Sequence, residues 1–368
     1  MQRRAFVKSA ASVTAGICLG GVQQAFAGNA SSLLDATGLL PYGRTAITNG
    51  QLELIGSASH FGFSFEGTTC RIWTSLSGGQ DHNYLQYELD GVYQKRIKVP
   101  GNNTEPVVLS ATVKGKHRVV MYKATEAHTG PVCIQKIEGK NLRIIKPAAA
   151  PLIEFIGDSI TCGAAADPSE VPCGQGVYHD QHNAYMAYGP RVARALKLNC
   201  MLSSVSGIGV YRNWNSDGPT MPQVYEKLDF QMAGNRLWDF KTYTPTVVSI
   251  ALGTNDFSGG DGKKPRLPFD SAGFVSNYIQ FVESVKSKYP SSQIALLSSP
   301  MITGEKRLLL QDSLTGVKGA IDRSYPAGNP VALYFFNPMQ ARGCSGHPSV
   351  DDHRILAEEA MPFFKSLL

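Results

Sequence analysis

The sequence predicts two folded domains: an antiparallel β-sandwich, then a three-layer α/β/α domain built on a parallel sheet. Short alternating apolar runs separated by turn residues fill the first half of the chain. In the second half, compact apolar runs alternate with amphipathic stretches. The length agrees with this division, because 368 residues that are 43% hydrophobic exceed one average domain and can bury two cores.

The first domain is expected over residues 28–146. Its predicted strands span residues 61–65, 70–76, 84–89, 92–99, 107–113, 118–123 and 132–137. Asp90-Gly91 lies between two of these runs and is a strong hairpin signal. No segment there keeps the three-to-four spacing of a helix, so the strands favour an antiparallel sandwich.

The second domain is expected over residues 152–368, after a proline-containing and therefore semi-stiff linker at residues 147–151. Its predicted strands span residues 152–156, 200–205, 246–252, 293–298 and 331–336. Its predicted helices span residues 184–196, 271–288, 305–321 and 349–367. This alternation specifies a parallel sheet covered by helices. Ligands of such sheets bind beyond the carboxyl ends of the strands, so the residues after each strand should carry the chemistry.

Residues 1–27 have the pattern of an export signal. Three basic residues and no acidic one precede a short apolar run, and the segment ends Ala25-Phe26-Ala27, which a signal peptidase accepts. The run is too short to span a bilayer. Arg3-Arg4 favours the twin-arginine route, with an ordinary secretory signal as the alternative. Ile17 before Cys18 argues against a lipid anchor, because the residue before a lipidated cysteine is small. From the whole segment we expect an exported bacterial protein, periplasmic or extracellular, without a membrane anchor.

The net charge of +6 falls to about +3 without this segment. No basic cluster remains that could follow a phosphate backbone, so nucleic acid is not an expected partner. The six remaining cysteines form no Cys-x-x-Cys pair, and we expect no metal site. Cys162 and Cys173 bracket a short polar loop that a disulfide could close, and buried free thiols are the alternative.

Four features follow successive predicted elements of the second domain, at the places where chemistry is expected. They are Ser159 within Gly157-Asp158-Ser159, Gly207 within Ser206-Gly207-Ile208-Gly209, Asn255 within Gly253-Thr254-Asn255-Asp256, and His347 before Pro348. Alone, each has an ordinary explanation: a helix N-cap, a turn, an Asx-turn and a surface-loop histidine. Together they favour a nucleophile, oxyanion donors and a general base at one edge of the sheet.

These blocks resemble the SGNH hydrolases, also called GDSL esterases, over about residues 152–368. The resemblance implies a flavodoxin-like arrangement of the parallel sheet. The preceding sandwich, taken with that domain, resembles carbohydrate esterase family two and implies a jelly-roll-like sandwich. Gly56, residues 61–67 and residues 87–91 are similar to that family's sandwich. Members of this family are exported enzymes that remove acetyl groups from plant polysaccharides.

The resemblance implies a role for each matching residue. Ser159 is the nucleophile, and His347 is its general base and then the acid for the leaving hydroxyl. The N–H groups of Ser159 and Gly207 and the side chain of Asn255 form the oxyanion hole. The reaction is acyl transfer to water through an acyl-enzyme on an acetylated polysaccharide or oligosaccharide, with no cofactor.

One position departs from the superfamily pattern. Cys344 stands three residues before His347, where an Asp is usual, and a thiol cannot orient an imidazole as a carboxylate does. Carbohydrate esterase family two shows a similar loss and uses a backbone carbonyl two residues before the His. Here that carbonyl belongs to Ser345, so we predict a Ser159–His347 dyad supported by it.

Other residues near the motifs are assigned as follows. Asp351, Asp352 and His353 follow Ser349 into a predicted helix and are expected to be structural. Residues 178–182, 211–214 and 257–269 are candidate lids, because they follow strands or motif blocks. Trp214 in a polar setting, Asp158 and Asp256 are the candidate substrate-binding residues.

Two other functions compete with polysaccharide deacetylation. A lipase or thioesterase would keep the Ser–His machinery and change the acyl group. A non-catalytic carbohydrate-binding protein would use the sandwich, but all four motif residues are retained. The sequence does not determine the polysaccharide or the oligomeric state.

Overall fold

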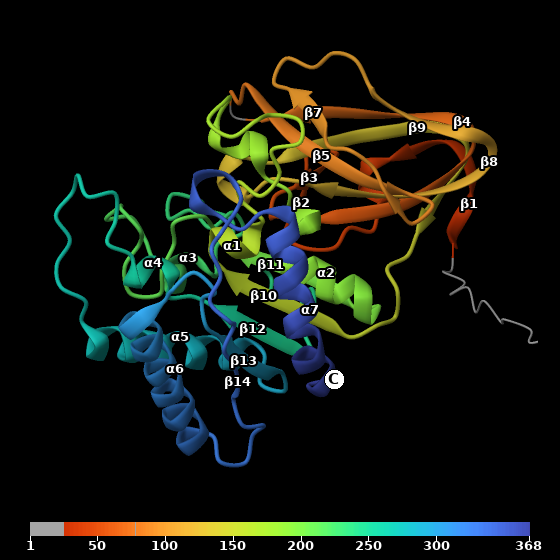
Figure 1. Cartoon of the computed structure of the whole chain (residues 1–368). Helices are drawn as coiled ribbons and strands as arrows, with labels where there is room; N and C mark the ends of the chain where they lie inside the picture. Colours follow the sequence, from red (N-terminus) through yellow and green to blue (C-terminus); the bar gives the residue numbers. More distant parts are fainter. Residues whose placement is uncertain (1–25, 78) are drawn as a thin grey trace, which may run out of the picture.

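The computed structural model describes residues 26–77 and 79–368, and Figure 1 shows two domains. Most of the predicted export signal lies outside these residues. Its last two residues, Phe26 and Ala27, begin strand β1 and pair with Ile145 and Ile144. No helix in the described ranges combines the length and apolar character that crossing a membrane requires.

The first domain is antiparallel, as predicted. Its strands are β1 (Phe26–Asp35), β2 (Thr45–Thr48), β3 (Gln51–Leu54), β4 (His60–Leu76), β5 (His82–Leu89), β6 (Val92–Tyr93), β7 (Ile97–Pro100), β8 (Val107–Lys123) and β9 (Val132–Ile145). Hydrogen bonds join these nine described strands into one sheet that curls over its own apolar core (Figure 1).

The curl explains where the predicted strand boundaries differ from the structure. The runs at 61–65 and 70–76 belong to one strand, β4, and those at 107–113 and 118–123 belong to β8. Gly67 adopts a φ of +121° where the β4–β8 register shifts, so the strands bend there without ending. The run at 92–99 divides into β6 and β7.

The second domain has a five-stranded parallel sheet in the order β11-β10-β12-β13-β14, which is flavodoxin-like, as predicted. Its strands are β10 (Leu152–Gly157), β11 (Asn199–Ser204), β12 (Val247–Ala251), β13 (Gln293–Leu297) and β14 (Ala332–Tyr334). Its α-helices are α1 (Ser159–Cys162), α2 (Tyr188–Leu196), α3 (Met221–Val224), α4 (Thr254–Phe257), α5 (Ser271–Lys288), α6 (Gly304–Ser324) and α7 (Val350–Ser366). The predicted helix at 184–196 is interrupted, because Ala187 is extended between the 3-10 turn Ala184–Met186 and α2.

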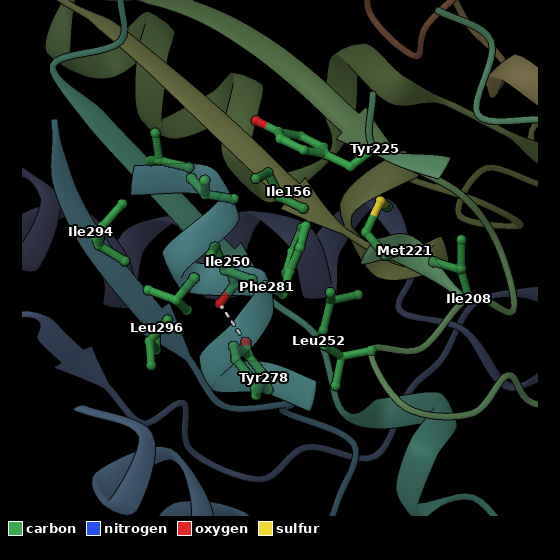
Figure 2. Packing of buried hydrophobic residues seen from close by; sticks show 14 of the residues in the cluster. Ile156, Ile208, Met221, Tyr225, Ile250, Leu252, Tyr278, Phe281, Ile294 and Leu296 are labelled. Atoms are coloured by element: carbon green, nitrogen blue, oxygen red, sulfur yellow. Dashed lines mark hydrogen bonds between the residues drawn. The ribbon is translucent and has the colours of Figure 1, made fainter. Parts of the chain in front are cut away.

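Helices cover both faces of this sheet. Residues of α5 and α6 pack on the face that presents Ile156 and Ile250, and Figure 2 shows Tyr278 and Phe281 of α5 in this layer. Residues of α2 and α7 pack on the opposite face around Phe155. Since both faces are buried, β10 and β12 are mostly apolar, with Glu154 and Ser249 as buried polar exceptions, and the carboxyl ends of the strands are held at one edge.

The curled domain inserts charged side chains into the second domain. Arg44, fully buried, donates to the carbonyl of Lys227 at 2.7 Å. Its guanidinium lies 4.3 Å from the centre of the Phe230 ring and 5.1 Å from that of Trp238. Such a desolvated cation inside an aromatic cluster fixes the position of one domain against the other.

Candidate active site

Ser159 begins helix α1, two residues after strand β10 ends. Asp158 is the N-cap of this helix and accepts from the N–H of Ile160 at 3.0 Å. The first N–H groups of a helix have no partner inside the helix, so the N–H of Ser159 points out of its end. Ser159 is the first residue after the cap and is 7% exposed. This position presents both its hydroxyl and its N–H at the edge of the sheet.

Gly207 lies in the turn after β11 with a φ of +75°, a conformation that favours glycine. Its carbonyl accepts from the N–H of Trp214 at 2.8 Å. In residues 26–77 and 79–368, the N–H of Gly207 donates to no protein atom. The glycine therefore offers a backbone donor at the rim, as an oxyanion hole requires.

Asn255 lies in helix α4 after β12, with only 6% of its surface exposed. Its Nδ2 donates one proton to the carbonyl of Ile208 at 2.7 Å and the other, in a long bond of 3.4 Å, to Oδ2 of Asp158. This second proton is therefore the one that an oxyanion would have to take from Asp158. These contacts connect the segments that follow β10, β11 and β12. The carboxamide donor is thus fixed in one orientation among the other two oxyanion candidates.

His347 lies on the loop before α7, and the structure shows what holds its ring. Nδ1 is 3.0 Å from the carbonyl oxygen of Ser345. A carbonyl can only accept, so Nδ1 carries the proton and Nε2 is left as an acceptor. Burial lowers the pKa of His347 and the Ser345 carbonyl partly offsets this, so the imidazole is neutral at neutral pH and suited to act as a base.

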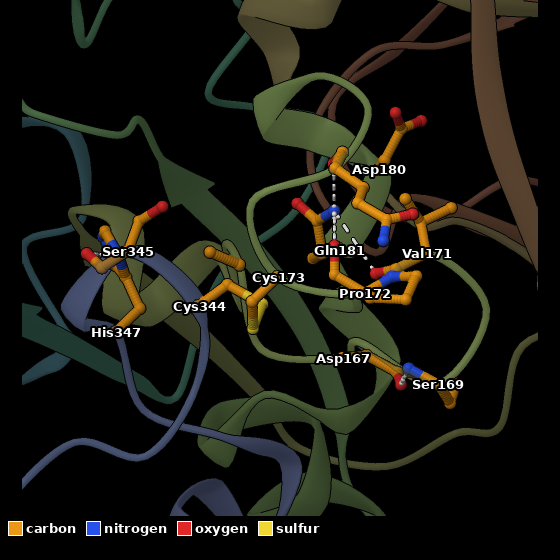
Figure 3. The surroundings of a disulfide bond; sticks show 12 residues. Asp167, Ser169, Val171, Pro172, Cys173, Asp180, Gln181, Cys344, Ser345 and His347 are labelled. Carbon is orange, nitrogen blue, oxygen red and sulfur yellow. Dashed lines mark hydrogen bonds between the residues drawn. A yellow bond between two sulfur atoms is a disulfide. The ribbon is translucent and has the colours of Figure 1, made fainter.

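The loop that carries His347 is joined to the turn after Ser159 on both sides. The N–H of Cys344 donates to Ala165 at 2.8 Å, and the N–H of Val350 donates to Ala166 at 3.1 Å. A disulfide between Cys173 and Cys344 adds a covalent tie (Figure 3). Ser345 adopts a φ of +50°, which turns its carbonyl back toward the ring of His347.

The pairing of Cys162 with Cys173 considered from the sequence is wrong. Cys162 ends α1, is fully buried, and donates through Sγ to Ser204 Oγ at 3.2 Å. Cys173 instead lies on the exposed loop beside Cys344, so proximity in the sequence did not identify its partner. Cys344, which stands where an Asp is usual, therefore anchors the loop that carries His347 through this disulfide.

The structure adds three residues to this site: Tyr178, His182 and Glu126. The sequence placed the first two only in a candidate lid and did not point to Glu126. Tyr178 Oη lies 3.3 Å from His347 Nε2 and 3.3 Å from Ser206 Oγ. Glu126, from the curled domain, accepts from the N–H of Ser206 at 2.6 Å and pairs through Oε1 with Nε2 of His182 at 3.4 Å. No local pattern marks Glu126, because it follows β8 and reaches the site only through the packing of the two domains.

Glu126 is buried but ionised. Burial would raise its pKa, but hydrogen bonds from His182 and Ser206 outweigh this and lower the pKa to about 2. Nδ1 of His182 lies 3.3 Å from the N–H of Ala165 and accepts from it, so the histidine presents its Nε2 proton to Glu126. The carboxylate thus connects the loop of Gly207, the candidate oxyanion donor, to the turn after Ser159.

Asp256 and Asp158 are engaged by protein donors. Asp256 is fully buried and accepts from the N–H groups of Val210, Tyr211 and Arg212 at 2.8–3.2 Å, which fixes the loop after Gly207. Burial raises the pKa of Asp158 to about 6.

Trp214 is 44% exposed and adjoins Gly207, where a ring can reach a bound ligand.

His353 has a structural environment, as expected. It is fully buried in α7, stacks against Tyr188 at 6.5 Å, and burial lowers its pKa to about 3. Asp352 forms a capping box with Ser349 and pairs with Arg342 at 2.6 Å.

One group among the described residues has metal-ligand chemistry: His82, His179 and Asp180, whose ligand atoms lie within 4.8 Å of one another. Asp180 accepts through Oδ1 from His82 Nε2 at 2.6 Å and from the Tyr84 hydroxyl at 2.8 Å. Its Oδ2 accepts from the N–H of Val177 at 2.7 Å. Protein donors therefore satisfy this carboxylate, and we assign no metal to it.

Comparison with known proteins identifies both domains. Residues 42–147 match the family described as carbohydrate esterase 2 N-terminal, and residues 155–333 match the GDSL-like lipase/acylhydrolase family. The chain belongs to the SGNH (GDSL) ester hydrolases and has the two-domain architecture of family two carbohydrate esterases.

Two curated relatives of this SGNH hydrolase are esterases. It is 31% identical over 327 residues to the cellulase/esterase CelE of Acetivibrio thermocellus, covering 85% of this chain and 37% of that protein. The chain thus spans little more than a third of the length of CelE. It is 28% identical over 312 residues to an acetylxylan esterase/glucomannan deacetylase of Cellvibrio japonicus, covering 82% and 81% of the two chains.

Solved structures show the same fold. A family two carbohydrate esterase from Clostridium thermocellum, in complex with cellohexaose, has a TM-score of 0.77 and 28% identity, covering 89% of this chain and 98% of that one. A family two carbohydrate esterase from Cellvibrio japonicus has a TM-score of 0.77 at 22% identity, covering 91% and 97%. The SGNH domain and the curled domain therefore occur together as one architecture.

Proposed function

We propose that this carbohydrate esterase is exported and removes O-acetyl groups from a plant-type polysaccharide such as acetylated xylan or glucomannan. The observation that supports this best is the alignment of His347: its Nδ1 proton is held by the Ser345 carbonyl, so Nε2 can accept the proton of Ser159. The relatives named acetylxylan esterase and glucomannan deacetylase support the acetylated sugar.

Each residue has a defined step in this reaction. Nε2 of His347 takes the hydroxyl proton as Ser159 Oγ attacks the acetyl carbonyl carbon, and the oxygen's negative charge develops toward the N–H groups of Ser159 and Gly207 and Nδ2 of Asn255. The imidazolium then gives its proton to the sugar oxygen as the C–O bond breaks. Water, deprotonated by the same nitrogen, hydrolyses the acetyl-enzyme and releases acetate.

The test is acetate release from acetylated xylan by the wild type, Ser159→Ala and His347→Ala. We expect both variants to lose at least about 10³-fold in kcat. Equal release by the wild type and Ser159→Ala would overturn the proposal. Rates on 4-nitrophenyl acetate, butyrate and octanoate separate an acetylesterase from a lipase, since an acetyl-sized site should lose rate as the acyl chain lengthens.

The pH profile gives a second test. The base works only when neutral, and burial lowers the pKa of His347 below its ordinary value. The acid limb of kcat/KM should therefore fall below about pH 6.5, the value for an unperturbed histidine. An acid limb above pH 7 would contradict the assignment of His347 as the base.

A further inference from the structure

A pocket of about 510 Å³ lies beyond β12, between the loop that joins α4 to α5 (Figure 1) and the start of α6. Arg212, Lys264, Arg266 and Lys306 line it. Its volume is within the range of sites that hold one or two sugar rings. No step of the ester hydrolysis described above uses these four cations.

The pocket adjoins the oxyanion residues. Arg266 donates through one terminal nitrogen to the carbonyl of Asn255 at 3.1 Å, and through the other to the carbonyls of Asn213 and Trp214. Arg212 donates through Nε to the carbonyl of Asp256 at 2.7 Å. Arg266 thus joins the pocket directly to the segments that carry Trp214 and Asn255.

Carboxylates neutralise the charge of the pocket only in part. Arg212 and Lys306 donate to the carbonyls of Leu267 and Phe257, and Arg266 also bonds carbonyls, none of which removes a formal charge. Lys264 alone pairs with a carboxylate, the exposed Asp217. The buried carboxylate of Asp256 accepts from three N–H groups behind Arg212 and interacts electrostatically with Arg266, so the four cations face two carboxylates, Asp217 and Asp256.

The remaining lining suits a sugar. In the wall of the pocket the half-buried Phe269 packs at a tilt against the buried Phe257, with ring centres 4.1 Å apart, and the Arg212 guanidinium lies 5.5 Å from the Phe269 ring. Apolar ring surface packs against the C–H face of a pyranose, while guanidinium and ammonium groups bind carboxylates. A neutral chain would not need this excess of positive charge, and an inorganic anion would not need the Phe269 ring.

We propose that this basic pocket binds the carboxylate of a uronic acid residue carried by the acetylated chain. The inference rests on the proposed esterase function and names its substrate class: an acidic acetylated polysaccharide such as glucuronoxylan. The modest net charge of +6 does not reveal this local excess, because the four cations come from three separate segments and gather only in the fold.

The test uses the full chain and two acetylated polymers, one with glucuronic acid side groups and one neutral glucomannan. We expect the wild type to prefer the acidic polymer in kcat/KM. The Lys264→Gln/Lys306→Gln variant should lower the acidic-to-neutral ratio about fivefold through KM, as expected for exposed ion pairs. Lys263→Gln removes a cation of the same loop that does not line the pocket, and its ratio should match the wild type.

A binding measurement separates this proposal from the esterase assignment. Ser159→Ala is titrated with a xylo-oligosaccharide that carries glucuronic acid and with the same oligosaccharide without it. We expect the acidic ligand to bind more tightly than the neutral one, and 0.5 M NaCl to reduce this difference by screening the charges. Such a result supports carboxylate binding in the pocket whatever the catalytic rate is. Equal affinity for both ligands, or an equal acidic-to-neutral ratio in the double variant and Lys263→Gln, overturns it.

Discussion

The proposed nucleophile side and the proposed base side of the active site are held in place by different means. Ser159, Gly207 and Asn255 follow adjacent parallel strands that are buried on both faces, so their positions derive from the core of the sheet. His347 lies on an irregular loop, and its position depends on a disulfide, backbone bonds to the turn after α1, and the Ser345 carbonyl. Substitutions on the first side should therefore remove a catalytic group, whereas substitutions on the second should leave the His347 imidazole chemically intact but displace it from its working position.

The largest effect is expected on the nucleophile side. Asn255→Ala removes one oxyanion donor, and kcat on 4-nitrophenyl acetate should fall about 10²–10³-fold. The loss should lie in kcat rather than KM, because the donor acts on charge that develops in the transition state. Thermal unfolding of the variant is the control, since Nδ2 also holds the carbonyl of Ile208. A loss below threefold would remove Asn255 from the oxyanion hole.

The disulfide tests the base side. In Cys173→Ser/Cys344→Ser the loop of His347 keeps its backbone bonds but loses its covalent tie, so we expect kcat to fall about tenfold as the imidazole samples unproductive positions. Unfolding should also become easier by about 2–4 kcal/mol, the usual range for a native disulfide. Cys200→Ser, which removes a free thiol, is the matched control. Unchanged kcat in the double variant would show that the backbone bonds alone suffice.

Glu126 joins the two sides, because it holds Ser206 beside Gly207 and pairs with His182 against the turn after Ser159. Glu126→Gln keeps the shape but removes the charge that accepts these bonds, and kcat should fall about fivefold to tenfold. Glu66→Gln is the control, since that carboxylate is exposed in the same domain and pairs with Lys140. Equal kcat in both variants would show that the curled domain only supports the fold.

The sequence predicted the parts of the site whose positions follow from sheet topology. Ser159, Gly207 and Asn255 come directly after apolar runs, so the parallel order of the strands brings them to one edge. The partner of Cys173 and the role of Glu126 were missed, because each depends on contacts between segments 171 and 80 residues apart that no local pattern records. The bends in β4 and β8 were missed for a related reason: a strand that curls through Gly67 has the same alternation as two shorter ones.

The smallest effect is expected from removing the Ser345 side chain. Its carbonyl, not its side chain, contacts Nδ1 of His347, so Ser345→Ala should change kcat less than twofold. Ser345→Pro is the opposing variant: proline fixes φ near −65°, whereas this position requires +50°, so the carbonyl would turn away from the ring. We expect this variant to lose about 10²-fold in kcat as the imidazole loses its orientation. A large loss in Ser345→Ala would mean that the hydroxyl, rather than the backbone, orients the base.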